Sequence, residues 1–143
     1  MNRRKQKKLS RALVGAAMMG DGGRVTALLG AGADADTADP DGTTPLYAAS
    51  VHGAADVVRL LLAAGADPNR ESGHGAEGTP LCAAACWGHE AAVRELLASG
   101  ADPALREDHG MGKSPLEWAR TGPYPGTIEA LSAADISPAR RPG

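Results

Sequence analysis

The chain has 143 residues, of which 43% are hydrophobic, 22% are charged and 3% are aromatic, and its formal net charge is −2. These values describe an ordinary soluble protein without a strong overall field, which excludes functions that depend on a high net charge. No apolar run approaches the roughly 18 residues that span a bilayer, and the chain starts without an apolar signal region, so we expect a cytoplasmic protein.

The N-terminal segment is strongly basic. Six of the 15 basic residues lie in the first eleven positions, and all 17 acidic residues follow from Asp21 onward. Terminal charge runs are usually solvated, so we expect residues 1–8 to form a disordered arm. The alternative is a contact of this arm with nucleic acid or an acidic membrane, but six exposed charges alone bind phosphates weakly and non-specifically. The expected partners therefore include neither nucleic acid nor a membrane.

Two short motifs recur with one period along the rest of the chain. Gly-Ala-Asp recurs at spacings of 33 and 35 residues, at 32–34, 65–67 and 100–102, each time shortly after a Leu-Leu pair. Thr-Pro-Leu or Ser-Pro-Leu recurs at spacings of 35 and 35 residues, at 44–46, 79–81 and 114–116. Two independent motifs in register indicate a repeat protein.

Each repeat predicts two helices. The Thr or Ser hydroxyl can cap the first helix, and the Pro that follows suits the first helical position, where an N–H is not needed. The second helix carries Val58, Leu61 and Leu62, or their equivalents, at the i, i+3, i+4 spacing of one apolar face. The Gly of Gly-Ala-Asp fits the left-handed position that ends a helix.

The period and both motifs resemble the ankyrin repeat, whose unit is a β-turn followed by two helices with the pattern Thr-Pro-Leu-His-x-Ala. The resemblance implies an all-α repeat solenoid of four stacked units with atypical terminal repeats, at about residues 9–36, 39–69, 70–104 and 105–133, before a tail at 134–143. The pattern's His is replaced by Tyr47, Cys82 and Glu117. In the last unit we expect Pro123 and Pro125 to interrupt the second helix. Trp118 is expected in the core of that unit.

The resemblance also implies a function. Proteins of this kind bind partners through the concave face of the first helices and through the loop tips, so we expect a monomeric, non-catalytic protein-binding module, an adaptor or an inhibitor. The variable positions that end the first helices are Met18, Met19, Val51, His52, Cys86 and Trp87. The loop tips add Asp41, Thr43, His74, Glu77, His109, Met111 and Lys113. Trp87 is the expected anchor, because Trp is frequent at interface hot spots.

Other motifs predict no chemistry. Residues 73–78 match G-x-G-x-x-G, but no apolar strand precedes them, so a loop is expected there instead of a nucleotide site. Cys82, Cys86 and His89 have a helical spacing but make only three candidate zinc ligands, and the two Cys fit a reducing compartment better than a disulfide. Cys86 with His52 is the one candidate nucleophile and base, without a predicted oxyanion donor. We expect no catalytic residue, cofactor or metal.

Overall fold

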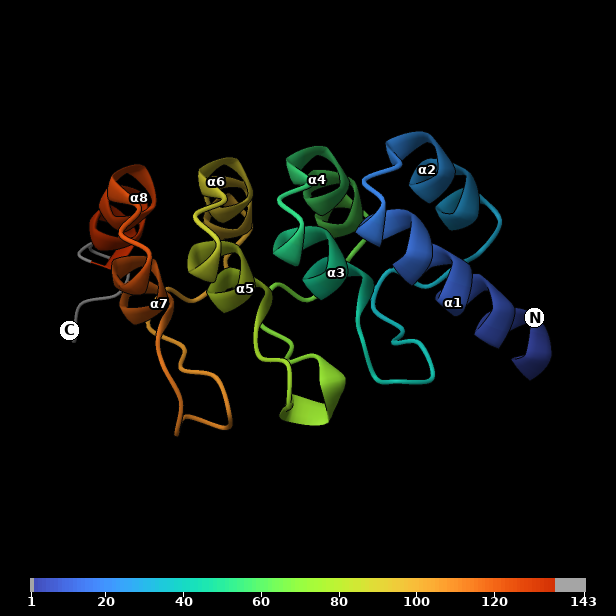
Figure 1. Cartoon of the computed structure of the whole chain (residues 1–143). Coiled ribbons are helices and arrows are strands. Elements are labelled where there is room, and N and C mark those ends of the chain that lie inside the picture. Colours follow the sequence, from blue (N-terminus) through green and yellow to red (C-terminus); the bar gives the residue numbers. More distant parts are fainter. Residues whose placement is uncertain (1, 136–143) are drawn as a thin grey trace.

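The described part of the chain, residues 2–135, forms eight helices that stack in two rows in the computed structural model (Figure 1). The first row contains α1 (Arg3–Met18), α3 (Pro45–Val51), α5 (Pro80–Cys86) and α7 (Pro115–Thr121). The second row contains α2 (Gly22–Gly30), α4 (Ala55–Ala63), α6 (Glu90–Ala98) and α8 (Pro125–Asp135). Each helix packs against its neighbours in the same row, and each first-row helix packs against the helix that follows it. The described residues form one isolated bridge and no strand, so the expected all-α repeat solenoid is confirmed.

Three long loops project from one side of the first row and are called fingers 1, 2 and 3, at residues 34–44, 67–79 and 102–114 (Figure 1). Finger 2 contains a short 3-10 turn, η1 (Gly73–Gly75). Hydrogen bonds connect neighbouring fingers, since the Gly73 amide donates to the Gly42 carbonyl over 2.8 Å and the Asp102 amide donates to Asn69 Oδ1 over 2.7 Å. The fingers therefore form a connected row of their own.

The short first-row helices begin at the predicted caps. The hydroxyls of Thr44, Thr79 and Ser114 accept a hydrogen bond from the backbone amide three residues later, over 3.2, 3.1 and 3.2 Å. Pro follows each cap at the start of the helix. The Gly of each Gly-Ala-Asp motif has a φ between 94° and 103°, a region that a side chain with a Cβ atom rarely adopts. Local sequence thus sets both ends of the two middle repeats and one end of each terminal repeat.

The hydrophobic core is continuous through all four repeats. Its largest fully buried side chains include one Leu or more from each repeat: Leu13, Leu46, Leu61, Leu81, Leu96 and Leu131. Small residues lie between them in the first row, where Ala49, Ala84 and Ala119 are fully buried and let neighbouring helices approach closely. Burial of a Leu contributes about 1.5 to 3 kcal/mol, so the stacking of repeats supplies most of the stability.

The N-terminal segment differs from the expected disordered arm, because helix α1 already begins at Arg3. The Asn2 side chain accepts a hydrogen bond from the Lys5 amide over 2.8 Å and caps the helix. Further along the same helix, Leu13 and Ala17 are fully buried against α2 and α3. Lys, Arg and Gln are good helix formers, so a helix anchored in the core extends back through them.

The last repeat also differs from expectation. Pro125 is the first residue of α8 and does not interrupt it, which agrees with the tolerance of Pro in the first turn of a helix. The expected tail begins within this helix, and its residues 136–143 lie outside the described part of the chain. No helix within residues 2–135 is both long enough and apolar enough to cross a membrane.

Candidate partner-binding surface

Within residues 2–135, four large hydrophobic side chains are exposed, and all four are among the partner-binding positions expected from the sequence. Met18 and Met19 lie at the end of α1 with 47% and 81% of their surface exposed. Trp87 follows the last residue of α5 and is 60% exposed, and Met111 at finger 3 is 86% exposed. Exposed Met adapts to irregular partner surfaces, whereas exposed Trp supplies a large, rigid contact area.

Trp87 borders a cavity of about 190 Å³ beside α5. We call this the aromatic cavity, and its lining residues are Tyr47, Glu77, Cys82, Ala83, Cys86, Trp87, Glu107 and Trp118. Three of the four aromatic residues of the chain are in this list. A larger cavity of about 480 Å³ shares Glu107 and Trp118 with it and extends along fingers 2 and 3. The expectation that Trp118 is a core residue is therefore only half right, because its ring packs on the core and also lines both cavities.

Glu107 and Trp118 hold each other in place between the two cavities. The indole Nε1 of Trp118 donates a hydrogen bond to Glu107 Oε1 over 2.7 Å. The Lys113 ammonium lies 4.5 Å from the centre of the Trp118 ring, a cation–π contact. The carboxylate of Glu107 also lies directly against the Cα of Gly78, where a Cβ atom would collide with it. Finger 2, finger 3 and α7 thus meet at one carboxylate.

The electrostatic environment of the aromatic cavity is acidic. Burial raises the pKa of Glu107, the Glu71 and Asp108 carboxylates raise it further, and the Trp118 hydrogen bond and Lys113 oppose them. The pKa of the Tyr47 hydroxyl is raised by burial and then by Glu77 and Glu107. A site with these properties favours a positively charged group, because a cation would relieve the repulsion among the carboxylates.

The two thiols near the cavity are poor nucleophiles. Burial raises the pKa of Cys82 to about 12, and burial followed by the charge of Glu107 raises the pKa of Cys86. Both thiols are therefore protonated at neutral pH, and the thiolate is the reactive form. His52 is exposed at the end of α3 and is absent from the cavity lining that contains Cys86.

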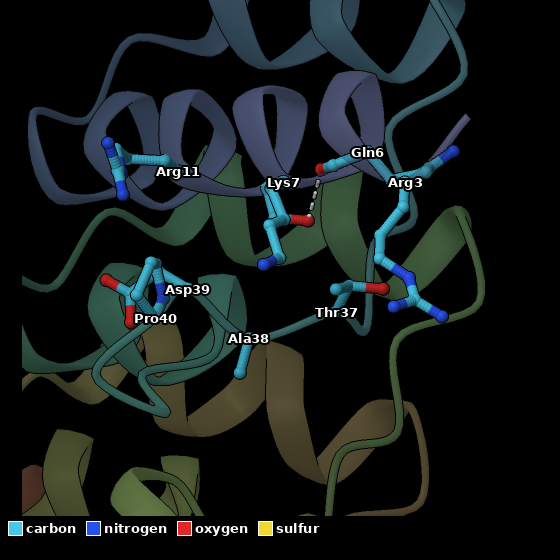
Figure 2. A pocket seen from close by; sticks show the side chains of 9 residues that line it. Arg3, Gln6, Lys7, Arg11, Thr37, Ala38, Asp39 and Pro40 are labelled. Atoms are coloured by element: carbon cyan, nitrogen blue, oxygen red, sulfur yellow. Dashed lines mark hydrogen bonds between the residues drawn. The ribbon is translucent and has the colours of Figure 1, made fainter. Parts of the chain in front are cut away.

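A second, basic surface lies at the other end of the molecule. A cleft of about 680 Å³ lies between α1 and finger 1, and we call it the basic cleft. Figure 2 shows the side chains that line it. Arg3, Lys7 and Arg11 line one side of it at four-residue spacing, so they share a face of α1. Within residues 2–135, none of the six basic side chains of α1 forms an ion pair. Across the cleft, Asp39 Oδ1 accepts from the amides of Asp41 and Thr43, each over 3.0 Å.

Comparison with known proteins identifies the family. A family model of ankyrin repeats in three copies matches residues 3–72, and a single ankyrin repeat matches residues 78–108. The chain belongs to the ankyrin-repeat family. Ankyrin repeats are in general protein–protein interaction modules, and ankyrin-repeat domains are non-catalytic.

One curated relative of this ankyrin-repeat protein is the 2-5A-dependent ribonuclease of Mus musculus. The two are 47% identical over 66 residues, which are 46% of this chain and 9% of the ribonuclease. The chain therefore spans a small part of that protein's length. The comparison supports the repeat architecture, whereas the ribonuclease activity belongs to that protein as a whole.

Several predicted finger residues connect the ankyrin repeats to each other. Thr43 Oγ1 donates to Glu77 Oε1 over 3.0 Å, and Ser72 Oγ donates to the same oxygen over 2.7 Å. The His109 amide donates to Glu71 Oε1 over 3.1 Å. Glu77 therefore joins fingers 1 and 2 and also lines the aromatic cavity, while His109 joins finger 3 to finger 2.

The remaining predicted positions lie apart from the aromatic cavity. Asp41 and His74 are exposed on fingers 1 and 2, and neither lines it. Val51 is half-buried at the end of α3, and its carbonyl lies 3.0 Å from His89 Nε2. This contact gives His89 a structural role between two ankyrin repeats. No group of three or more His, Cys, Asp or Glu residues in the described range could hold a metal ion.

Sequence reasoning missed Glu107 as a site residue. Its place depends on finger 3, where Asp108 and His109 both have a φ of 53°. Residues other than Gly adopt this left-handed region infrequently, although Asp and His do so more than most. An Asp-His-Gly sequence is consistent with such a turn. It does not predict that the turn brings the Glu107 carboxylate to Trp118 of the next helix.

Proposed function

We propose that this ankyrin-repeat protein is a monomeric, non-catalytic adaptor or inhibitor that binds a partner protein through its first-row helices and fingers. The observation that carries the proposal is Trp87, which is 60% exposed at the border of the aromatic cavity. A solvated indole beside a concave site is unfavourable in isolation, and burial against a partner would remove its apolar surface from water. The adaptor and the inhibitor use the same surface and differ in whether the partner stays active when bound.

A capture experiment tests this function. Tagged wild-type protein is incubated with lysate of the source cells beside two variants, Trp87→Ala and Arg94→Ala. Arg94 lies on α6 in the second row and is exposed, so its variant controls for a surface truncation elsewhere. We expect a partner that wild type and Arg94→Ala retain and that Trp87→Ala loses, with circular dichroism spectra that agree for all three. Equal capture by all three would refute the role of Trp87.

A second candidate function is association with nucleic acid through α1. The basic side chains that form no ion pair within the described chain favour it, because unpaired cations on one helix can neutralise phosphates. Deletion of residues 1–11 would remove much of α1, so the better test replaces the basic residues with Gln and keeps the helix: Arg3, Arg4, Lys5, Lys7, Lys8 and Arg11. A gel shift that weakens with salt and disappears in this variant would support the candidate. Absence of any shift at low salt would reject it.

A further inference from the structure

The lining of the aromatic cavity combines rings and carboxylates in a way the rest of the described chain does not repeat. Both tryptophans and one of the two tyrosines line it, in a chain that contains no Phe. The lining also contains two carboxylates, Glu77 and Glu107, and no Lys, Arg or His from the described part of the chain. The faces of aromatic rings are electrostatically negative and attract cations. The negative charge of nearby carboxylates attracts cations as well.

One ring of this group, that of Trp118, already contacts a cation. Lys113 places its ammonium 4.5 Å from the Trp118 ring centre. Lys113 lines the larger neighbouring cavity and is absent from the lining of the aromatic cavity. The aromatic cavity therefore offers the same chemistry as the contact with Lys113, and none of the described residues that line it is a cation.

We propose that the aromatic cavity binds an arginine side chain from a basic segment of the partner protein. The proposal rests on the proposed function and specifies its partner. A guanidinium group is planar, so it can stack on an indole and still donate N–H groups to a carboxylate in the ring plane. Trp87 and Trp118 supply the indoles, and Glu77 and Glu107 supply the acceptors.

The hydrogen bonds already present prepare Glu107 for this role. Its Oε1 atom is occupied by Trp118, while Oε2 has no hydrogen-bond partner within the described residues. Burial and the neighbouring carboxylates raise the pKa of Glu107, which means that the Trp118 hydrogen bond and Lys113 compensate its charged form only in part in the free protein. An incoming guanidinium would donate to Oε2 and supply that compensation.

The neighbouring cavity indicates how the segment would continue. The larger cavity of about 480 Å³ adjoins the aromatic cavity through Glu107 and Trp118, and Asp108 adds a further carboxylate to its lining. A second basic residue next to the arginine can therefore reach an acidic surface. Phosphate-bearing ligands are disfavoured at the aromatic cavity, because their charge has the same sign as Glu77 and Glu107.

Intrinsic fluorescence measures occupancy directly, since both tryptophans of the chain line the aromatic cavity. The probe is the peptide acetyl-Gly-Arg-Arg-Gly-amide, titrated into the full chain beside peptides with citrulline or lysine in place of both arginines. Citrulline keeps the shape and removes the charge. We expect a saturable fluorescence change with arginine and a Kd at least about tenfold higher with citrulline.

Two variants change the affinity in opposite directions, so that loss of folding cannot imitate the result. Glu107→Gln keeps an acceptor for Trp118 and should raise the Kd for the arginine peptide about tenfold. Lys113→Gln removes the competing cation and should lower it. Glu129→Gln is the matched control, because it removes the same charge from an exposed position on α8 and should leave the Kd unchanged.

Three results would overturn the proposal: equal affinity for the arginine and citrulline peptides, an unchanged Kd in Glu107→Gln, or at least tenfold tighter binding of the lysine peptide. The last result would assign the cavity to an ammonium group instead of a guanidinium. Failure here is separable from failure of the proposed function. A partner lost by Trp87→Ala without any peptide binding leaves the protein-binding role in place and removes the arginine site.

Discussion

The basic cleft and the aromatic cavity occupy comparable places in the solenoid but have opposite charge. Each lies where a first-row helix meets a finger: α1 and finger 1 for the basic cleft, and α5 with fingers 2 and 3 for the aromatic cavity. The backbone scaffold is the same repeat in both places. The difference shows that the stacking residues set the position of a binding surface, whereas the variable residues set its chemistry.

The two surfaces also differ in how firmly their charges are held. The cations of the basic cleft stand on a helix of 16 residues and form no ion pair with the described residues. At the aromatic cavity, Glu77 accepts hydrogen bonds from Thr43 and Ser72, and Glu107 accepts one from Trp118. Prearranged groups lose less conformational entropy on binding. The aromatic cavity is therefore suited to a specific contact, and the basic cleft to long-range attraction.

The largest expected effect on stability concerns Gly78, which lines the larger cavity next to the aromatic cavity. Gly78 and Gly65 have left-handed φ values of 98° and 100°, but a Cβ at Gly78 would collide with the Glu107 carboxylate, whereas a Cβ at Gly65 has no neighbour within 4 Å. Gly65→Ala should destabilise by about 1 to 2 kcal/mol from backbone strain alone. Gly78→Ala should lose about 1 kcal/mol more, because the displaced carboxylate would give up its bond to Trp118.

Urea unfolding measures this difference between the two glycine variants. Tryptophan fluorescence of the folded Gly78→Ala variant should also change, since Trp118 loses its partner, while Gly65→Ala should keep the wild-type spectrum. Equal losses of stability in the two variants, with equal spectra, would mean that Glu107 moves aside freely and is not held in the cavity.

The sequence predicts those features of the two surfaces that depend on residues close together in the chain. The caps at Thr44 and Thr79 and the ends of the helices are local, so residue types three or four apart predict them. The exposure of Trp87 also follows, because the repeat register places it at the end of a first-row helix. The pairing of Glu107 with Trp118 does not follow, since it joins a finger with left-handed turns to the next helix. The basic cleft was missed because residues 3–8 were expected to lack a helix.

Charge reversal on α1 should change the stability of the protein less than the glycine substitutions do, and it should increase stability where they decrease it. Lys8 lies four residues after Arg4 and three before Arg11, and like charges at these spacings repel by about 0.2 to 0.5 kcal/mol each. Lys8→Glu turns these repulsions into attractions and should stabilise the protein by about 1 kcal/mol at low salt. The gain should nearly vanish at about 1 M salt, where the screening length is about 3 Å.

The control for this reversal is Arg59→Glu on α4. Arg59 already pairs with Asp56 over 2.6 Å and lies 3.8 Å from Glu95, so reversal there replaces attraction with repulsion and should destabilise. Thermal melts across a salt series compare the two variants. A destabilised Lys8→Glu variant at low salt would show that the basic side chains of α1 do not repel one another in the folded protein.

The smallest effect on stability separates a binding role of Glu107 from a structural one. The pKa of Glu107 is higher in the folded protein than in the unfolded chain, so the folded protein binds this proton more tightly. Protonation of Glu107 therefore contributes to the free energy of unfolding below the unfolded-state pKa, and this contribution is lost as pH rises through the folded-state pKa. Glu107→Gln should therefore match wild type near pH 4 and exceed it near pH 7, by less than about 1 kcal/mol because the side chain remains partly solvated. Urea unfolding at both pH values tests this. A loss of stability at pH 7 would make the carboxylate a structural element of finger 3. If Glu107→Gln gains stability and binds the arginine peptide more weakly, the charged carboxylate destabilises the free protein and serves binding. Such an exchange of stability for function is common at binding sites.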